Sequence, residues 1–186
     1  MRRKFLVAAG ALVVGLPAIA AEVGGVKLEE RISLGGKDLV LNGAGIRTRL
    51  MFKVYVCSLY LTTKAGDLAG VLASNPRRVQ MNLLRDLSAS DLAEALANGI
   101  KETSTPEQAA AVKAQTDQLL ALMKSIGEAK TGDVVTLDFI GGETRVGFNG
   151  QPRGSVAGEA LNAALMRIWL ADKPVQADLR KALLAL

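Results

Sequence analysis

The sequence has 186 residues, of which 49% are hydrophobic, 22% charged and 4% aromatic, and its formal net charge is +5. A chain of this length forms one domain with a sizeable core and is too short to expect two. It contains no histidine and a single cysteine, which excludes Ser-His-Asp and Cys-His catalysis, the usual zinc sites and an intrachain disulfide.

The first 20 residues have the pattern of a secretory signal peptide. A basic start (residues 2–4) precedes an apolar run (residues 5–16), a proline and a small-x-small motif that ends at Ala20. The alternative is a retained membrane anchor, but the apolar run stops short of the roughly 20 residues that spanning requires. We therefore expect cleavage between Ala20 and Ala21, a periplasmic or secreted product, and one domain over residues 21–186.

Most of the positive charge belongs to this predicted signal peptide. Removing its three basic residues leaves 20 of the 23 lysines and arginines against 18 acidic residues, a net charge of about +2. Arg77-Arg78 is the only pair of adjacent arginines that remains, and aromatic residues are few. A nucleic-acid binder needs a basic surface with stacking side chains, so we expect no nucleic-acid partner.

In chain order, the residues after the signal first predict strands. A β-hairpin comprises residues 26–34 and 37–46, joined by Gly35-Gly36. The glycines of the stretch Asn42 to Gly45 indicate a bulge or a close approach to a ligand. A third strand follows at residues 50–62, and because both of its faces are apolar we expect a central strand that is covered on two sides.

The middle of the chain predicts three helices and one strand. A short helix at residues 66–73 and a strand at residues 77–84 precede a helix that opens at the capping pattern Ser88 to Asp91. Another helix opens at Thr105-Pro106 and continues to Gly127. We expect the two longer helices to form an αα-hairpin.

The last third of the chain repeats the pattern of strands followed by helices. Its predicted elements are a β-hairpin of residues 133–140 and 143–148, a tight turn at Asn149-Gly150, a short extended segment at residues 153–156, a helix from Gly158 that breaks at residues 172–174, and a short final helix. The whole order predicts an α+β domain, in which an antiparallel β-sheet has one face covered by a layer of helices, an open-faced sandwich.

Arg47 and Tyr55 are the candidate ligand-binding residues. Burial of Arg47 beside an apolar strand is unfavourable unless an anion pairs with it, and guanidinium holds a carboxylate by two parallel hydrogen bonds. Tyr55 adds a phenolic donor. The alternative is a solvated turn arginine and a tyrosine that only packs. Eight residues span roughly 26 Å on a straight strand, so the two share a ligand only if the chain bends between them.

No other residue predicts chemistry. Cys57 lies in the most apolar strand, where we expect a buried and inert thiol. The sequence predicts neither a metal site nor a cofactor.

Two stretches resemble the chalcone isomerase superfamily, especially its bacterial chalcone isomerase-like members. They are Gly43 to Arg47 followed by FKVYVCSLYL at residues 52–61, and ALMRIWLADKP at residues 164–174. The resemblance implies an antiparallel sheet under helices and no cofactor. Plant members either cyclise chalcones or bind fatty acids through an arginine and a tyrosine. Arg47 matches the family arginine, and Tyr55 falls where the enzymes carry a threonine.

The resemblance also has departures. The enzymes of the family carry a tyrosine and, seven residues later, an asparagine at the start of a helix, and here these positions fall at Asp91 and Asn98. The catalytic phenol is therefore missing. Asn98 lies on the helix side away from Leu92 and Leu96, so we do not predict it as a site residue.

Three functions remain open. The leading hypothesis is a secreted, non-catalytic protein that binds a small amphipathic carboxylate such as a fatty acid in a cleft between sheet and helices, with Arg47 as anion anchor and Tyr55 as second donor. The first alternative is a cofactor-independent isomerase or intramolecular lyase acting on a phenolic or enolisable substrate, with unknown catalytic residues. The second is a structural or partner-binding envelope protein, in which large side chains fill the space between sheet and helices.

Overall fold

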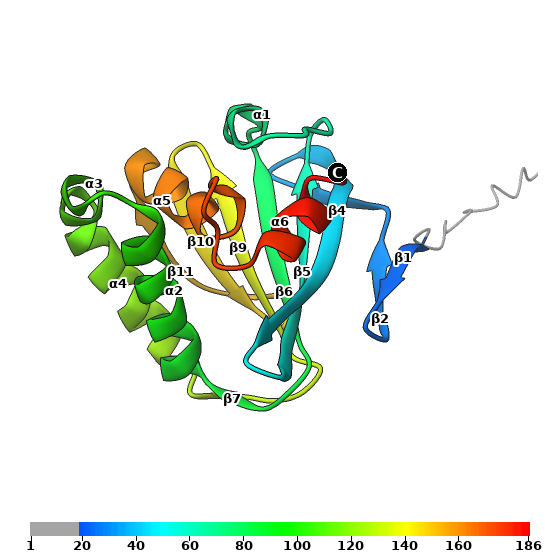
Figure 1. Ribbon diagram of the computed structural model, residues 1–186, viewed down its shortest axis with the longest axis horizontal. Helices are drawn as coiled ribbons and strands as arrows, with labels where there is room; N and C mark the ends of the chain where they lie inside the picture. The colour runs from blue at the N-terminus through cyan, green and yellow to red at the C-terminus, as the bar shows by residue number, and fades with distance from the viewer. Residues whose placement is uncertain (1–18) are drawn as a thin grey trace, which may run out of the picture.

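The structure is a computed structural model that describes residues 19–186, and a curled antiparallel sheet forms its centre (Figure 1). Its seven strands are β3 (Arg31–Leu34), β4 (Lys37–Arg49), β5 (Phe52–Leu61), β6 (Arg77–Leu83), β9 (Val134–Ile140), β10 (Glu143–Phe148) and β11 (Gln151–Ala157). They pair in the order β11-β10-β9-β6-β5-β4-β3, each antiparallel to its neighbour. The predicted central place of β5 is confirmed.

Helices cover one face of this sheet (Figure 1). They are α1 (Leu68–Ala73), α2 (Ala89–Thr103), α3 (Pro106–Ala111), α4 (Lys113–Lys124), α5 (Glu159–Leu170) and α6 (Ala177–Leu183). The helix α2 packs between α4 and α5, while α6 crosses β4 and β5. A short strand pair, β7 (Leu87–Ser88) with β8 (Glu128–Ala129), joins the start of α2 to the residues after α4. The predicted open-faced α+β sandwich and the αα-hairpin are therefore confirmed.

A small β-hairpin covers the opposite face of the sheet at β4 and β5. Its strands are β1 (Ile19–Val23) and β2 (Val26–Glu29), joined by Gly24-Gly25. Gly24 packs against Ile46 and Val56, and the Tyr60 hydroxyl donates to the carbonyl of Glu29 at 3.2 Å. Because helices cover one side of β5 and this hairpin covers the other, both faces of the strand are apolar.

Two predicted elements are divided in the structure. Residues 26–34, predicted as one strand, form β2 and β3, because the Gly24-Gly25 turn folds β2 back onto β1 instead of into the main sheet. The helix predicted from Thr105 to Gly127 divides into α3 and α4 at Val112, which has φ −109° and ψ 8°. Val112 buries its side chain in the core there, so tertiary packing interrupts the helix.

The predicted signal peptide lies outside the described residues, except for Ile19 and Ala20 at the start of β1. Cleavage between Ala20 and Ala21 stays a prediction, and it would leave the pairs Ala21–Leu28 to Val23–Val26 of the β1–β2 hairpin intact. Within residues 19–186, no helix has both the length and the apolar character needed to cross a membrane.

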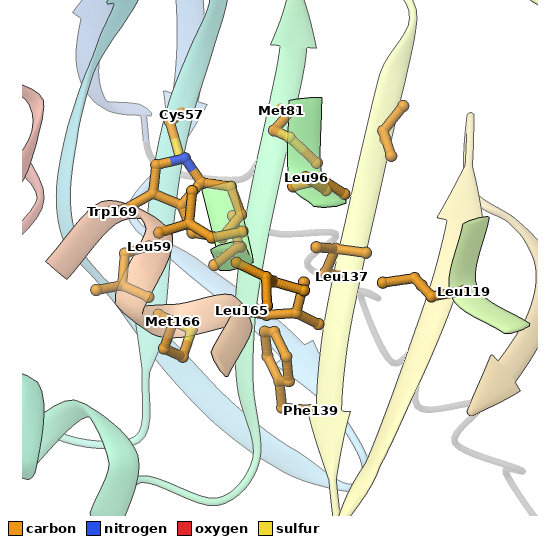
Figure 2. Close-up of a cluster of buried hydrophobic side chains, with 14 of the residues drawn as sticks. Cys57, Leu59, Met81, Leu96, Leu119, Leu137, Phe139, Leu165, Met166 and Trp169 are labelled. Carbon is orange, nitrogen blue, oxygen red and sulfur yellow. The ribbon is translucent and has the colours of Figure 1, made fainter. Parts of the chain in front are cut away.

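The core fills most of the space between the sheet and α5 (Figure 2). Trp169, Leu165 and Met166 of α5 project toward β5, β6 and β9, where they meet side chains such as Leu59 and Leu137. All five are at most 1% exposed. A ligand between sheet and helices therefore has room only at the ends of this layer.

The glycines of β4 make room for α6. The bulge predicted at this stretch is confirmed, because the β4–β5 register shifts between Leu41 and Gly43. Asn42 at the bulge donates to the carbonyl of Leu183 at 2.8 Å. A Cβ atom at Gly43 would overlap the carbonyl oxygen of Ala182, so the close approach is to the helix backbone and not to a ligand.

We expect Gly43→Ala to lower the free energy of unfolding by about 1–3 kcal/mol, because the added methyl must push α6 away from β4. Urea denaturation followed by circular dichroism measures this change. Gly66→Ala is the matched control, since a Cβ atom there would meet only a Leu186 methyl at 4.0 Å. Equal stability of the two variants would show that α6 does not depend on this contact.

Candidate functional site

A cleft of about 380 Å³ opens between the sheet and α2 at one end of the helical layer. This volume falls within the range of small-molecule sites, roughly 300–1,000 Å³. Its walls are the β4–β5 hairpin and α2, and residues of α5 and of the segment after it complete the lining. The lining residues are Arg47, Arg49, Leu50, Phe52, Val54, Tyr55, Arg85, Leu87, Asp91, Leu92, Glu94, Ala95, Leu96, Asn98, Ile168 and Val175.

Both predicted site residues line this cleft and face each other across two strands. The chain reverses at Leu50-Met51, so that Arg47 of β4 is the direct cross-strand partner of Tyr55 of β5. Directly opposite residues in an antiparallel pair have Cβ atoms roughly 5 Å apart. The eight-residue separation along the sequence therefore does not keep the two side chains apart.

Arg47 is partly buried and is held by backbone and amide oxygens instead of a carboxylate. Its Nη1 atom donates to the carbonyl of Thr48 at 2.9 Å, to the carbonyl of Val175 at 3.3 Å and to Oε1 of Gln176 at 3.2 Å. These acceptors fix the position of the guanidinium but carry no negative charge. No carboxylate among the described residues therefore pairs with this guanidinium.

Gln176, immediately before α6, ties the C-terminal segment to β4. Its Oε1 atom also accepts from the backbone N–H of Thr48 at 2.9 Å, and its Nε2 atom donates to the carbonyl of Ile46 at 3.1 Å. One amide thus satisfies the backbone groups on both sides of Arg47 and one nitrogen of its guanidinium. Gln176 therefore holds Arg47 together with the carbonyls of Thr48 and Val175.

The other edge of the Arg47 guanidinium is available to a ligand. Within residues 19–186, the well-aligned hydrogen bonds of this side chain all involve Nη1, and the guanidinium also lies close enough to the Tyr55 hydroxyl to lower the pKa of that phenol. Neither Nε nor Nη2 is a buried atom without a partner. Nε and Nη2 form the edge of guanidinium that donates two parallel hydrogen bonds to a carboxylate. Chemically, the site can bind one anionic head group beside Tyr55.

Tyr55 places a neutral phenol next to this edge. Its side chain is 6% exposed, and its oxygen accepts a hydrogen bond from Trp169 Nε1 at 3.1 Å. Burial raises the pKa of the Tyr55 phenol well above its ordinary value of 10.0, and the Trp169 N–H and the Arg47 charge offset only part of this shift. The phenol therefore stays protonated at neutral pH and acts as a hydrogen-bond donor.

Charged groups are distributed unequally around the cleft. The hairpin side and its neighbourhood contribute Arg47, Arg49 and Arg85, while α2 contributes Asp91 and Glu94. Within the described part of the chain, no three His, Cys, Asp or Glu side chains lie close enough to share a metal ion. An anion is therefore attracted to the hairpin side of the cleft.

Sequence reasoning missed several of these contacts. Gln176 and Trp169 lie 114 to 130 positions from their hydrogen-bond partners on the hairpin, and no local pattern marks such contacts. Asn98 was set aside because it lies away from the apolar face of α2, yet it lines the cleft, as does Asp91. In the sequence, a polar residue of a helix that faces an open cleft looks the same as one that faces solvent.

The prediction for Cys57 is confirmed. The thiol is 0% exposed, and burial raises its pKa well above the ordinary value of 9.0. A thiol that is buried and protonated does not act as a nucleophile.

Comparisons with known proteins agree with the fold. A sequence model described as chalcone isomerase-like matches residues 20–185. Chains of solved structures also match, 37 in number, among them the crystal structure of a fatty-acid binding protein from Arabidopsis thaliana. That protein is 13% identical, with a TM-score of 0.66, over 86% of this chain and 92% of that chain. The search of curated proteins finds no match.

We expect the pKa shift of Tyr55 to make stability fall at high pH. The unfolded chain ionises this phenol near pH 10 while the folded chain keeps it protonated, so the free energy of unfolding decreases as pH rises above about 10. Tyr55→Phe removes this contribution. Its free energy of unfolding should therefore fall less steeply with pH than that of the wild type, and the two slopes should differ by up to about 1.4 kcal/mol per pH unit. Urea denaturation at several pH values measures both slopes, and parallel curves would contradict a buried phenol.

Proposed function

This chain belongs to the chalcone isomerase-like family, and we propose that it binds fatty acids or similar amphipathic carboxylates without catalysing a reaction on them. The proposal is carried by one observation: Arg47 lines the cleft, and its Nε and Nη2 edge has no carboxylate and no well-aligned acceptor among the described residues. Charge-assisted, bidentate hydrogen bonds are the strong ones in proteins, and a carboxylate supplies both acceptors.

The second donor for such a head group is Tyr55. Its oxygen already accepts from Trp169, which leaves the hydroxyl proton to be donated. Because burial keeps the phenol protonated, Tyr55 can give a hydrogen bond to a carboxylate oxygen without repelling the charge. Arg47 and Tyr55, opposite one another on β4 and β5, then hold one carboxylate between them.

The rest of the cleft suits a hydrocarbon chain. Apolar side chains come from the strand wall, from α2 and from the C-terminal segment: Val54, Leu87, Leu92, Leu96, Ile168 and Val175. Each methylene removed from water contributes about 0.8 kcal/mol to binding. Affinity is therefore expected to come mostly from the chain, and orientation from the carboxylate at Arg47.

The alternative of an isomerase requires a proton donor or acceptor whose pKa lies near the working pH. The pKa of the Tyr55 phenol is raised instead, which favours hydrogen bonding over proton transfer. Asp91, at the position of the enzymes' tyrosine, borders the cleft but carries no phenol. Consumption of a chalcone above the uncatalysed rate, lost in Arg47→Ala, would establish the isomerase alternative.

We also propose that residues 1–20 direct export and are removed. The support is the basic start, the apolar run and the small-x-small motif before Ala21. The proposed protein is then periplasmic or secreted.

The central prediction concerns Arg47. We expect Arg47→Ala to weaken binding of palmitate by roughly 10- to 100-fold, which is the loss of a hydrogen-bonded charge pair. Isothermal titration calorimetry of the delipidated protein measures the affinity. Arg47→Lys should recover only part of it, because an ammonium cannot present the two-pronged edge.

Two controls separate the head group from the chain. Arg145→Ala removes an exposed arginine on β10, paired with Glu143 and outside the cleft, and should leave palmitate affinity unchanged. Methyl palmitate lacks the anionic oxygen, so it should bind the wild-type protein and Arg47→Ala about equally. Equal palmitate affinities of the wild type and Arg47→Ala would refute the proposed anchor.

For export, expression of residues 1–186 in a Gram-negative host should yield a periplasmic protein that begins at Ala21. Intact-mass measurement of the fractionated protein gives the cleavage position. Replacing Ala18 and Ala20 by bulky residues should block processing, because the small-x-small motif is then lost. An unprocessed chain that stays in the cytoplasm in the wild type would contradict the proposal.

A further inference from the structure

The turn between β4 and β5 differs from every other two-residue hairpin turn in residues 19–186. Four of these five turns are Gly-Gly or Asn-Gly, at Gly24-Gly25, Gly35-Gly36, Gly141-Gly142 and Asn149-Gly150. The fifth is Leu50-Met51. Leu50 has a φ of +55°, at the first position of the turn, where glycine is the preferred residue. The chain therefore places a bulky side chain where its own other turns use small ones.

The unusual turn exposes a compact apolar tip, which we define as Leu50, Met51 and Phe52. Leu50 is 91% exposed, Met51 93% and Phe52 57%. Apart from Leu186, these are the large apolar side chains that the described part of the chain leaves exposed. The tip lies where β4 ends and β5 begins, at the opposite end of these strands from the C-terminus (Figure 1).

Cationic side chains surround this tip. Arg49 and Lys53 flank it along the hairpin, and the Arg85 guanidinium lies 4.8 Å from the centre of the Phe52 ring. None of the three takes part in an ion pair among the described residues. The nearest acidic neighbour in sequence, Asp86, already accepts from Thr131 and lies 3.6 Å from Lys130. Three positive charges therefore have no acidic partner among the described residues.

We propose that this tip docks on the surface of an anionic phospholipid bilayer. Leu50 and Met51 enter the interface while Arg49, Lys53 and Arg85 contact lipid phosphates. Peripheral membrane binding of this kind needs apolar side chains together with basic ones. A protein partner would require about 800 Å² of complementary surface, which a two-residue turn does not offer. A fluid bilayer needs no matching shape.

Docking by the tip would place the cleft at the membrane. Leu50, Phe52, Arg49 and Arg85 belong both to the tip region and to the lining of the cleft. A molecule in the outer lipid layer would then reach the cleft without crossing bulk water. The docking itself does not rest on the proposed fatty-acid binding, and the two are measured separately.

The test is co-sedimentation of the purified, processed protein with sucrose-loaded vesicles. We expect binding to vesicles of phosphatidylglycerol and phosphatidylcholine to exceed binding to pure phosphatidylcholine by roughly tenfold or more, and to weaken as salt rises. Met51→Asp should reduce binding to the anionic vesicles by roughly tenfold. Leu186→Asp is the matched control, since it changes an exposed leucine far from the tip and should leave binding unchanged.

A second variant tests whether the tip has a structural role instead. Leu50→Gly with Met51→Asn gives the turn the chemistry of a regular hairpin, so we expect equal or higher thermal stability together with loss of vesicle binding. Unchanged vesicle binding in this variant, or equal binding to neutral and anionic vesicles, would overturn the proposal. A wild-type dimer in light scattering that the variant abolishes, without any vesicle binding, would assign the tip to a second copy and overturn it equally.

Separate variants distinguish a failure of the proposed membrane docking from a failure of the proposed fatty-acid binding. Arg47→Ala should keep vesicle binding within about twofold, because its guanidinium is partly buried and held by backbone carbonyls. Met51 lies outside the cleft lining, so Met51→Asp should keep palmitate affinity. A protein that sediments with anionic vesicles but does not bind palmitate would retain the docking and lose the proposed ligand.

Discussion

The antiparallel pairing of β4 with β5 determines how the two candidate ligand-binding side chains lie relative to each other. Reversal at Leu50-Met51 sets Arg47 opposite Tyr55, and the C-terminal segment then locks both side chains, Gln176 holding the first and Trp169 the second. A slip of one residue in either strand would turn that strand's side chains to the other face of the sheet and so separate Arg47 from Tyr55. The bulge at Asn42 and its hydrogen bond to the end of α6 stabilise the register.

Arg47 shows how a partly buried charged side chain can be held in place by the protein and still be available to bind a ligand. Carbonyl and amide oxygens satisfy one nitrogen but leave the net charge in place. Removing a charge from water is unfavourable unless a counter-ion accompanies it, so a bound carboxylate would stabilise the arginine as well as the ligand. The phenol of Tyr55 contributes a dipole without adding a second charge.

The sequence predicted the parts of the fold that local chemistry encodes. Glycine pairs and alternating apolar residues located the hairpins at Gly35-Gly36 and Gly141-Gly142, and capping residues located the starts of α2 and α3. The break at Val112 could not be predicted in this way, because burial against distant residues interrupts an otherwise helical pattern. Strand β1 was missed because its first residues coincide with the signal-like segment.

The candidate site was predicted only in part, because some of its residues are marked by local sequence and others are brought in from distant parts of the chain. Composition singled out Arg47 and Tyr55, but their positions opposite one another follow from a two-residue turn that lacks the usual glycine. Gln176 and Trp169 come from the other end of the chain. An amphipathic pattern identifies which side of α2 faces the core, and it cannot distinguish a cleft-facing Asn98 from a solvated one.

The contacts of Gln176 have a consequence for biogenesis. They join residues separated by up to 130 positions, which raises the contact order of the site well above that of the hairpins around it. A chain that emerges amino terminus first can form β4 and β5 long before residue 176 arrives. Until residues 175 and 176 pack against β4, Arg47 lacks two of its three hydrogen-bond acceptors, so the cleft is complete only when the two ends of the domain have come together.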